Sequence, residues 1–570
     1  MTEHERKWWK EGTVYQIYPS SFLDSNGDGI GDIGGIISKL DYLKELGIDI
    51  IWLSPHYKSP QVDMGYDISD YKDIHGPYGT VQNTVDLIDG CHSRGMKIIF
   101  DLVVNHTSDQ HEWFKESRKS RDSPKRDWYI WQEAKYDENG RRIPPNNWEA
   151  FFGGSAWEWD EPTQQYYLHL FCKEQPDLNW ENPVVREAIY EDACNFWLEK
   201  GVDGFRIDTV NLYSKVPGFP DAPIINPDNQ YQAGYKLYSN GPRMHEFLKE
   251  MYEKTYGRYD AFTVGELGNT PDDMVLDYVS ASRKELSQVF KFNVVDTGRN
   301  EAEDRFLVRP WKLSQFKAGF VANQKLIDGT DAWTTTFIEN HDQPRSISRF
   351  GKDDLEHYEI TGKLLATLIA GMSGTLYIYQ GQEIGMTNFS RDWTLDDYKD
   401  VASIDYFNIY KQRHGVKKAL DVAMNNLQKS ARDHSRTPVQ WDDSENAGFT
   451  RGKPWMRVND NYKHINVKSQ LEQSDSVLQY YRRALQVRKQ YKDLFVYGKF
   501  MLEDKDNEDV FTYIKEYRGQ KAIFYLNFSS DRQPLAEVQG FENAKLVLSN
   551  VPGEITGDLS PYEGRIYVSV

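Results

Sequence analysis

KIIFDLVVNH, residues 97–106, is a continuous apolar run that ends in two polar residues. Continuous rather than alternating apolar character is typical of a strand buried on both faces. Similar runs recur with helical patterns between them, at residues 13–19, 48–55, 204–208, 262–266, 289–293, 335–340 and 375–381. Eight strand–helix repeats predict an α/β fold, a (β/α)8 TIM barrel.

Polar residues follow four of these runs. They are Asn105, His106, Arg206, Asp208, Glu266, Asn340, His341 and Asp342. A single acid after a strand is usually a turn or capping residue. In a barrel, however, the ends of the strands meet at the face that carries active sites. Acids gathered there raise one another's pKa, which an acid/base site uses, so the pattern favours an enzyme.

A second polar stretch, DSNGDGIGD at residues 24–32, offers the oxygen ligands of a calcium loop. An EF-hand needs a bidentate Glu six residues after its central Gly. Here Gly29 fits that pattern, but the closing position is Gly35. The loop is therefore no EF-hand, but its oxygen atoms could still hold a hard cation in another geometry, which the surrounding sequence has to decide.

Composition narrows the class of protein. At 570 residues the chain is expected to form two or three domains. Its net charge of −19 argues against nucleic acid and anionic membranes as partners. The three cysteines make no disulfide framework, and we find neither a signal peptide nor a long apolar span, so we expect a cytoplasmic protein.

The strand-end sequences also carry a family resemblance. DLVVNH, GFRID, VGE and ENHD resemble, in order, the four short motifs of the family 13 glycoside hydrolases, the α-amylase family. QPDLNW (175–180) resembles a fifth motif of the oligoglucosidase branch, and FFGGSAW and SRTPVQW resemble the yeast maltases and isomaltases.

The resemblance implies a domain plan. The catalytic barrel would comprise residues 1–107 and 179–500, with an insertion at about 388–450 after the eighth strand. Residues 108–178, too long for a plain loop, would form a B domain over the cleft. Residues 501–570 alternate in strand fashion and would form a C-terminal antiparallel β domain.

By the same resemblance, Asp208 is the nucleophile and Glu266 the acid/base of a retaining glycosidase. Arg206 would keep Asp208 ionised, because residues two apart on a strand share a face. Asp342 would complete the catalytic set by binding sugar hydroxyls. His106 and His341 would donate hydrogen bonds to the sugar, although a buried core histidine is the commoner role.

The resemblance also assigns a closed end to the site and an ion to the loop. Asp63 and Arg432 would bind the terminal glucose, Tyr66 would stack on it, and Phe152 and Phe171 are candidate apolar walls. The expected structural calcium ligands, with magnesium as an alternative ion, are Asp24, Asn26, Asp28, Asp32 and the Ile30 carbonyl. No organic cofactor is indicated.

These residues predict a monomeric, exo-acting α-glucosidase that releases α-glucose from maltose-like oligosaccharides and sucrose. In the resembling family, Val after the nucleophile accompanies α-1,6 specialists, whereas Thr or Ala accompanies α-1,4 activity. This chain has Thr209, which is compatible with some α-1,6 cleavage of isomaltose as well.

Three alternatives remain open. The first is an oligo-1,6-glucosidase. The second is a sucrose isomerase or transglucosidase, although the Arg-rich isomerisation motif is not evident in residues 301–312. The third is a non-catalytic heavy chain of an amino-acid transporter, which would need a membrane span and usually lacks the acids.

Overall fold

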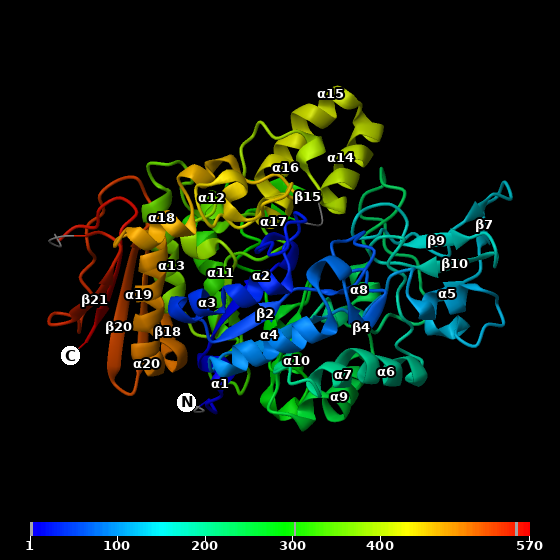
Figure 1. The fold of residues 1–570 in the computed structure, drawn as a ribbon, viewed down its shortest axis with the longest axis horizontal. Helices are drawn as coiled ribbons and strands as arrows, with labels where there is room; N and C mark the ends of the chain where they lie inside the picture. The colour runs from blue at the N-terminus through cyan, green and yellow to red at the C-terminus, as the bar shows by residue number, and fades with distance from the viewer. Residues whose placement is uncertain (1–3, 301–303, 553–556, 570) are drawn as a thin grey trace.

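The computed structural model describes residues 4–300, 304–552 and 557–569. Its centre is a parallel sheet in the strand order β13-β12-β11-β5-β2-β1-β17-β16 (Figure 1). The strands are β1 (Thr13–Ile17), β2 (Ile50–Leu53), β5 (Lys97–Leu102), β11 (Gly204–Ile207), β12 (Phe262–Glu266), β13 (Gln288–Phe290), β16 (Thr335–Thr336) and β17 (Thr375–Tyr379). Each overlaps one of the eight predicted runs, so the predicted strands are confirmed.

The sheet curves until its two ends meet. On β16, the Thr335 hydroxyl donates to the Val289 carbonyl of β13 at 3.1 Å. Inside, the rings of Trp52 on β2 and Phe290 on β13 lie 5.5 Å apart, although three strands separate them within the sheet. Such a contact requires a closed interior, and the predicted (β/α)8 barrel is confirmed.

Amphipathic helices cover the outside of the barrel. In α4, for example, Leu87, Ile88 and Cys91 recur at helical spacing on the buried face, and Thr80 and Asn83 cap the first turn reciprocally. The main helices between successive strands are α2 (Ile33–Ser38), α3 (Leu40–Leu46), α4 (Val81–Ser93), α6 (Pro183–Ile189), α9 (Met244–Lys254), α10 (Asp272–Val279), α11 (Leu313–Lys325) and α13 (Tyr358–Ala370). Shorter helices, α5 (Glu112–Arg118), α7 (Phe196–Leu198), α8 (Tyr235–Tyr238) and α12 (Ser346–Phe350), lie in the same connections. After the last strand, α19 (Val477–Gln490) packs beside α3 and α13.

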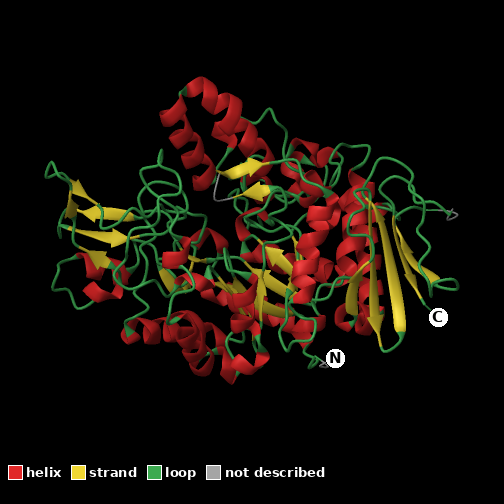
Figure 2. Cartoon of the chain, turned by 180° about the vertical axis from the view of Figure 1, so that it is seen from behind, coloured by secondary structure: helices red, strands yellow, loops and turns green. Residues whose placement is uncertain are grey.

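Three further segments surround the barrel (Figures 1 and 2). Within residues 108–178, β6 (Trp131–Gln132), β9 (Trp157–Asp160) and β10 (Gln165–Leu168) form an antiparallel sheet beside a hairpin of β7 (Lys135–Tyr136) and β8 (Arg142–Ile143). After β17 come α14 (Val401–His414), α15 (Val416–Lys418), α16 (Met424–Ser430) and α17 (Asp433–Arg436).

The third segment is the predicted C-terminal antiparallel sheet. Its strands are β18 (Lys499–Leu502), β19 (Val510–Tyr517), β20 (Gln520–Asn527), β22 (Gly564–Val568) and β21 (Lys545–Ser549), in that spatial order. It packs on α13, at the opposite end of the molecule from β9 and β10 (Figure 1). The residue bounds proposed for the domains stay a prediction.

Candidate active site

A pocket of about 790 Å³ opens where the barrel strands end. Ten residues predicted from the sequence line it: Asp63, Tyr66, His106, Phe152, Phe171, Asp208, Thr209, Glu266, Asp342 and Arg432. Two predicted residues, Arg206 and His341, do not line it and lie behind its wall, at 1% and 0% exposure. The barrel thus brings together residues that lie between positions 63 and 432 of the sequence.

The floor of the pocket is organised by the guanidinium of Arg206. Its Nη1 donates to Asp208 Oδ1 at 2.6 Å, and its Nη2 donates to Glu266 Oε2 at 2.6 Å. Its Nη1 also donates to Asp101 Oδ1 at 2.8 Å. These groups come from the adjacent strands β5, β11 and β12 or the residue that follows. One positive charge therefore faces three carboxyl groups, which favours keeping one of them protonated.

Burial gives the two proposed catalytic carboxyls different pKa values. Burial raises the pKa of Glu266 to about 8, against the pull of Arg206 and with help from the charges of Asp208 and Asp342. Burial raises the pKa of Asp208 to about 6, and Arg206 opposes that rise. Near pH 7, Asp208 is then mainly ionised and Glu266 mainly protonated, which is the division that nucleophile and general acid require.

The inner end of the pocket is closed by an ion-pair network. Arg432 donates from Nη1 to Asp342 Oδ1 at 3.0 Å and from Nη2 to Asp63 Oδ1 at 3.3 Å, so the predicted pairing of Asp63 with Arg432 is present. Arg436 Nη2 also donates to Asp342 Oδ1, at 2.9 Å. Although burial opposes it, the interactions with His341 and with the positive charges of Arg432 and Arg436 hold the pKa of Asp342 well below its usual range. The inner end of the pocket therefore keeps a fixed negative charge at Asp342.

The two histidines differ in what they offer a ligand. His106 lines the pocket, and its Nε2 lies 3.1 Å from the Tyr66 carbonyl and 3.2 Å from Gln175 Nε2. His341 was expected to donate to the sugar, but Gln16 occupies its Nδ1 at 2.8 Å and the Tyr66 hydroxyl its Nε2 at 2.6 Å. Burial lowers the pKa of His341 to about 3, so it is a neutral support beneath Tyr66.

Aromatic rings form the side walls. The Tyr66 ring is stacked on His341, with centroids 5.3 Å apart. Phe152 meets Phe171 edge to face at 5.8 Å, and the guanidinium of Arg432 lies 5.3 Å from the Phe152 ring. Tyr66 is thereby held rigidly, as a platform for a sugar ring requires.

Thr209 has a strained backbone. Its φ of 39° lies in the left-handed region, which is rare for a β-branched residue. Its N–H donates to Glu266 Oε2 at 3.2 Å, and its hydroxyl donates to Asp208 Oδ2 at 3.1 Å. The structure thus directs this hydroxyl at the proposed nucleophile. Backbone strain of this kind clusters at functional sites.

Several pocket residues were not predicted from the sequence. On the outer half they include Tyr235, Tyr406, Ile409, Tyr410 and Arg413. Behind the inner end, Asp400 and Arg436 do not line the pocket but contact Arg432 and Asp342, respectively. Most lie on the helical insertion after β17, where no strand end marks a residue as functional. The family resemblance alone pointed to that region, through Arg432 and the motif SRTPVQW.

The candidate calcium loop is stabilised by hydrogen bonds from its own backbone N–H groups. Asp24 accepts hydrogen bonds from the N–H groups of Asn26, Gly27 and Gly29, and Asp32 caps α2 through the Gly35 N–H. A Cβ at Gly29, whose φ is +93°, would lie 1.9 Å from the Lys453 carbonyl, so the loop packs tightly on a distant segment. The oxygen donors are of the type calcium prefers. Among the described residues, however, the three loop carboxylates do not gather around one point.

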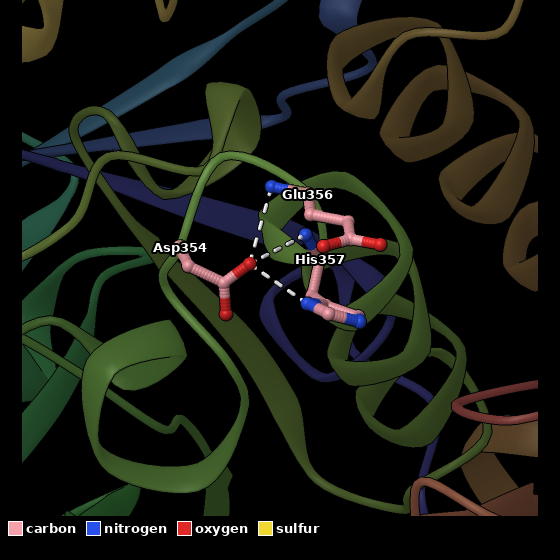
Figure 3. Close-up of side chains that lie close together, drawn as sticks. All are labelled: Asp354, Glu356 and His357. Atoms are coloured by element: carbon pink, nitrogen blue, oxygen red, sulfur yellow. Dashed lines mark hydrogen bonds and ion pairs between the residues drawn. The ribbon is translucent and has the colours of Figure 1, made fainter.

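Away from the pocket, one group of described side chains could bring three metal-binding atoms together: Asp354, Glu356 and His357 (Figure 3). Asp354 Oδ1 accepts from the backbone N–H groups of Glu356 and His357 and lies 2.7 Å from His357 Nδ1. These bonds account for the cluster as a turn, stabilised by the Asp354 side chain, that leads into α13 (Tyr358–Ala370).

The geometry so far defines a class: a (β/α)8 protein with two buried carboxyls of opposite protonation preference in a closed pocket. Comparison with known proteins identifies the family within this class. The family "Alpha amylase, catalytic domain" matches residues 16–498. The chain belongs to this glycoside hydrolase family.

The relatives match the chain over its full length. An α-glucosidase of Candida albicans is 52% identical, covering 100% of both chains, and the oligo-1,6-glucosidase IMA3 of Saccharomyces cerevisiae is 47% identical, covering 100% of this chain and 98% of the relative. The isomaltulose synthase SmuA of Protaminobacter rubrum superposes with a TM-score of 0.92 at 41% identity, covering 99% of each chain. No helix in the described ranges is both long and apolar enough to cross a bilayer.

Proposed function

We propose that this family member is a retaining, exo-acting α-glucosidase that releases α-glucose from the non-reducing end of maltose-like oligosaccharides and sucrose, with isomaltose as a lesser substrate. The observation that carries the proposal is the sharing of Arg206 by Asp208 and Glu266, at 2.6 Å each. Two carboxyls on one guanidinium are close together, as retaining enzymes require, whereas inverting enzymes separate them by roughly 6.5–9.5 Å.

In the first step, Asp208 attacks the anomeric carbon and forms an ester bond while the glycosidic bond breaks. Glu266 gives its proton to the departing oxygen. In the second step, the Glu266 carboxylate takes a proton from water as that water attacks the anomeric carbon and releases Asp208. Two displacements at one carbon give α-glucose from an α-glucoside.

The network at the inner end supports exo action. Arg432 joins Asp63 to Asp342, and Phe152 and Phe171 wall the same end. A longer chain could not pass through this end, so the terminal glucose has to enter first. The fixed charges of Asp63, Asp342 and Arg432 suit hydrogen bonding to the hydroxyls of that glucose.

Two other reactions are the second and third candidates. The relatives named as oligo-1,6-glucosidases support α-1,6 cleavage, and the isomaltulose synthase supports glucosyl transfer. Thr209 favours the first proposal on the family pattern. The segment expected to carry an isomerisation motif, residues 301–312, includes positions 301–303, which lie outside the described residues.

One experiment separates these reactions. The purified protein is supplied with maltose, isomaltose and sucrose side by side, and the anomeric proton of the released glucose is followed by NMR. We expect α-glucose first, fastest release from maltose, and little reaction with a cyclic glucan that has no end. Initial release of β-glucose, or conversion of sucrose to an isomer without free glucose, would contradict the proposal.

We further propose that the 24–32 loop binds one calcium or magnesium ion with a structural role. The chemistry of its donors, Asp24, Asn26, Asp28, Asp32 and the Ile30 carbonyl, supports this assignment. Chelation, or Asp28→Ala, should lower the melting temperature by a few degrees while leaving turnover per folded molecule nearly unchanged. An unchanged melting temperature together with no metal by elemental analysis would refute it.

Two properties complete the proposal. The three cysteines, Cys91, Cys172 and Cys194, are free and buried, which supports a reducing compartment such as the cytoplasm. The second property that we propose is a monomeric state. Light scattering of the purified protein tests the second property.

A further inference from the structure

Asp400 is a fully buried carboxylate that lies between helix α14 and the arginines of the inner end. Its Oδ2 accepts from Arg432 Nε at 2.8 Å, and its Oδ1 accepts from Arg432 Nη2 at 2.5 Å. Its Oδ1 also lies 3.4 Å from Arg436 Nη1. The contact with Arg432 is bidentate and shorter than the 3.3 Å contact between Arg432 and Asp63. Asp400 is thus the nearest anchor of Arg432.

The positive charges of Arg432 and Arg436 keep Asp400 ionised and so strengthen this contact. Burial opposes ionisation of Asp400, but Arg432 and Arg436 prevail and lower its pKa to about 2. On the other side, a single oxygen of Asp342 accepts from both arginines, at 3.0 and 2.9 Å. The two arginines are therefore held between two carboxylates, one in the pocket wall and one behind it.

We propose that Asp400 is a positioning residue for the glucose-binding end, an inference that rests on the proposed function. By holding Arg432 and Arg436 from behind, it keeps them from collapsing onto Asp342, and so it fixes the orientation in which Asp342 meets the sugar. Without the Asp400 charge, both arginines would draw closer to Asp342 and Asp63, and the pocket would change shape where the glucose hydroxyls bind.

Asp400 also joins this end to the outer half of the pocket. Its carboxylate accepts from the Ala402 N–H at 3.3 Å and caps the N-terminus of α14. Residues of the same helix, Tyr406, Ile409 and Tyr410, line the outer half. A shift of the Asp400 side chain would therefore move the wall that faces the leaving group as well as the arginines.

The chain offers a matched control in Asp433. This residue is also buried, at 1% exposure, and its carboxylate supports the same segment through the N–H groups of Lys399 and Asp400 and the Ser403 hydroxyl. It has no hydrogen bond to either arginine among those found in the described residues. Asp433→Asn therefore weakens the same segment while leaving the Asp400–arginine contacts in place.

The test compares Asp400→Asn, Asp400→Glu and Asp433→Asn with the wild type on maltose and on p-nitrophenyl α-glucoside. Folded protein is quantified by circular dichroism and thermal melting. We expect Asp400→Asn to lose about 100-fold in kcat/KM per folded molecule, mostly in kcat, because a misplacement of about 1 Å costs that much. Asp433→Asn should stay within about threefold of wild type even where it melts earlier.

Asp400→Glu keeps the charge on a longer arm and should retain at least about ten times the activity of Asp400→Asn. Equal activity of these two variants, an Asp400→Asn value within about threefold of wild type, or an equal loss in Asp433→Asn would each overturn the assignment. If Asp400→Asn does not fold, Asp400→Glu becomes the decisive variant. A kcat about tenfold below wild type, with KM and melting temperature unchanged, supports the assignment. An unchanged kcat overturns it. Wild-type turnover of either substrate tests the proposed function separately.

Discussion

The inner and outer halves of the same pocket are built differently. At the inner end, Arg432 and Arg436 hold Asp63, Asp342 and Asp400 through ion pairs of 2.5 to 3.3 Å, in which Asp63 and Asp400 are buried and Asp342 is partly buried. In the outer half, aromatic rings such as those of Tyr406 and Tyr410 line the walls beside polar groups, and one polar contact there is exposed, from Arg413 Nη1 to Asn229 Oδ1 at 3.1 Å. A Cβ at Gly268 would meet nothing within 4 Å, so there is open space beside Glu266.

This difference explains how one pocket can select one part of its substrate strictly and tolerate variation in another part. Buried, fully paired charges reject a ligand that cannot replace their hydrogen bonds, because an unpaired buried charge is costly. Aromatic surface accepts many shapes, since it offers area without fixed directions. We therefore expect strict selection of the terminal glucose and tolerance toward the group to which it is attached.

The largest effect is expected at the floor, which both halves share. Asp208→Asn is nearly isosteric and removes the proposed nucleophile, so turnover should fall more than about a thousandfold for every substrate while the fold stays intact. Steady-state assays and circular dichroism on the purified variant check this. Residual activity above that level would require a different nucleophile.

A smaller but contrasting effect should separate the two halves. Asp63→Asn removes a charge from the inner network and should cost about 10- to 100-fold in kcat/KM, since a hydrogen bond to a charged group is worth about 1.5–3 kcal/mol. Arg413→Ala removes only an exposed contact, worth about 0–1 kcal/mol, and should cost less than about fivefold.

The two variants are assayed on maltose and on p-nitrophenyl α-glucoside. We expect the Asp63→Asn loss to be similar on both, because both substrates present the same terminal glucose. If Arg413→Ala lost as much as Asp63→Asn, the proposed division between a strict and a permissive half would be wrong.

The pH dependence of kcat/KM should be set by the two carboxyls at the floor of the pocket, Asp208 and Glu266. As pH rises through about 6, Asp208 loses its proton and activity should rise; as pH passes about 8, Glu266 loses its proton and activity should fall. The profile of kcat/KM for the free enzyme is then bell-shaped, with about a tenfold change per pH unit on each outer limb. Because the two carboxyls interact, the limbs belong to the pair rather than to single residues.

Substitution in the outer half gives the control for that profile. Arg413→Ala should leave both limbs where they are in the wild type, because Arg413 is not among the groups that shift the pKa of Asp208 or Glu266. A limb displaced by a full pH unit in this variant would show that the two halves are electrostatically coupled.

The inner and outer halves also differ in how far the sequence predicted them. Buried parallel strands are continuously apolar, so they were visible as runs, and Asp208 and Glu266 stood out as polar residues where runs end. Asp400 and Arg436 lie in an insertion without that marker, and their role depends on contacts with residues distant in the chain. His341 lies behind the pocket wall rather than in it, because its ring nitrogens are taken by Gln16 and Tyr66, partners that could be found only in the fold.

The smallest effect is expected where the two halves meet, at Thr209. The family pattern links this position to the bond that is cut, and Thr209→Val replaces a hydroxyl with a methyl group of similar shape at a φ of 39°. In the wild type this hydroxyl donates to Asp208 Oδ2 at 3.1 Å. A hydrogen bond of about 1 kcal/mol corresponds to roughly a factor of five. Part of that factor should appear as lower turnover of both substrates, because Asp208 acts on both.

The rest should appear as a change in preference, since Thr209 lines the pocket and a methyl group makes its wall apolar. We expect the ratio of maltose to isomaltose hydrolysis to move toward isomaltose by less than about fivefold, measured with both sugars in one competition assay. Thr209→Ser keeps the hydroxyl and loses the methyl group, so it should leave the ratio closer to wild type. A ratio that does not move in Thr209→Val, or that moves equally in Thr209→Ser, would show that the hydroxyl at this junction does not set the linkage preference.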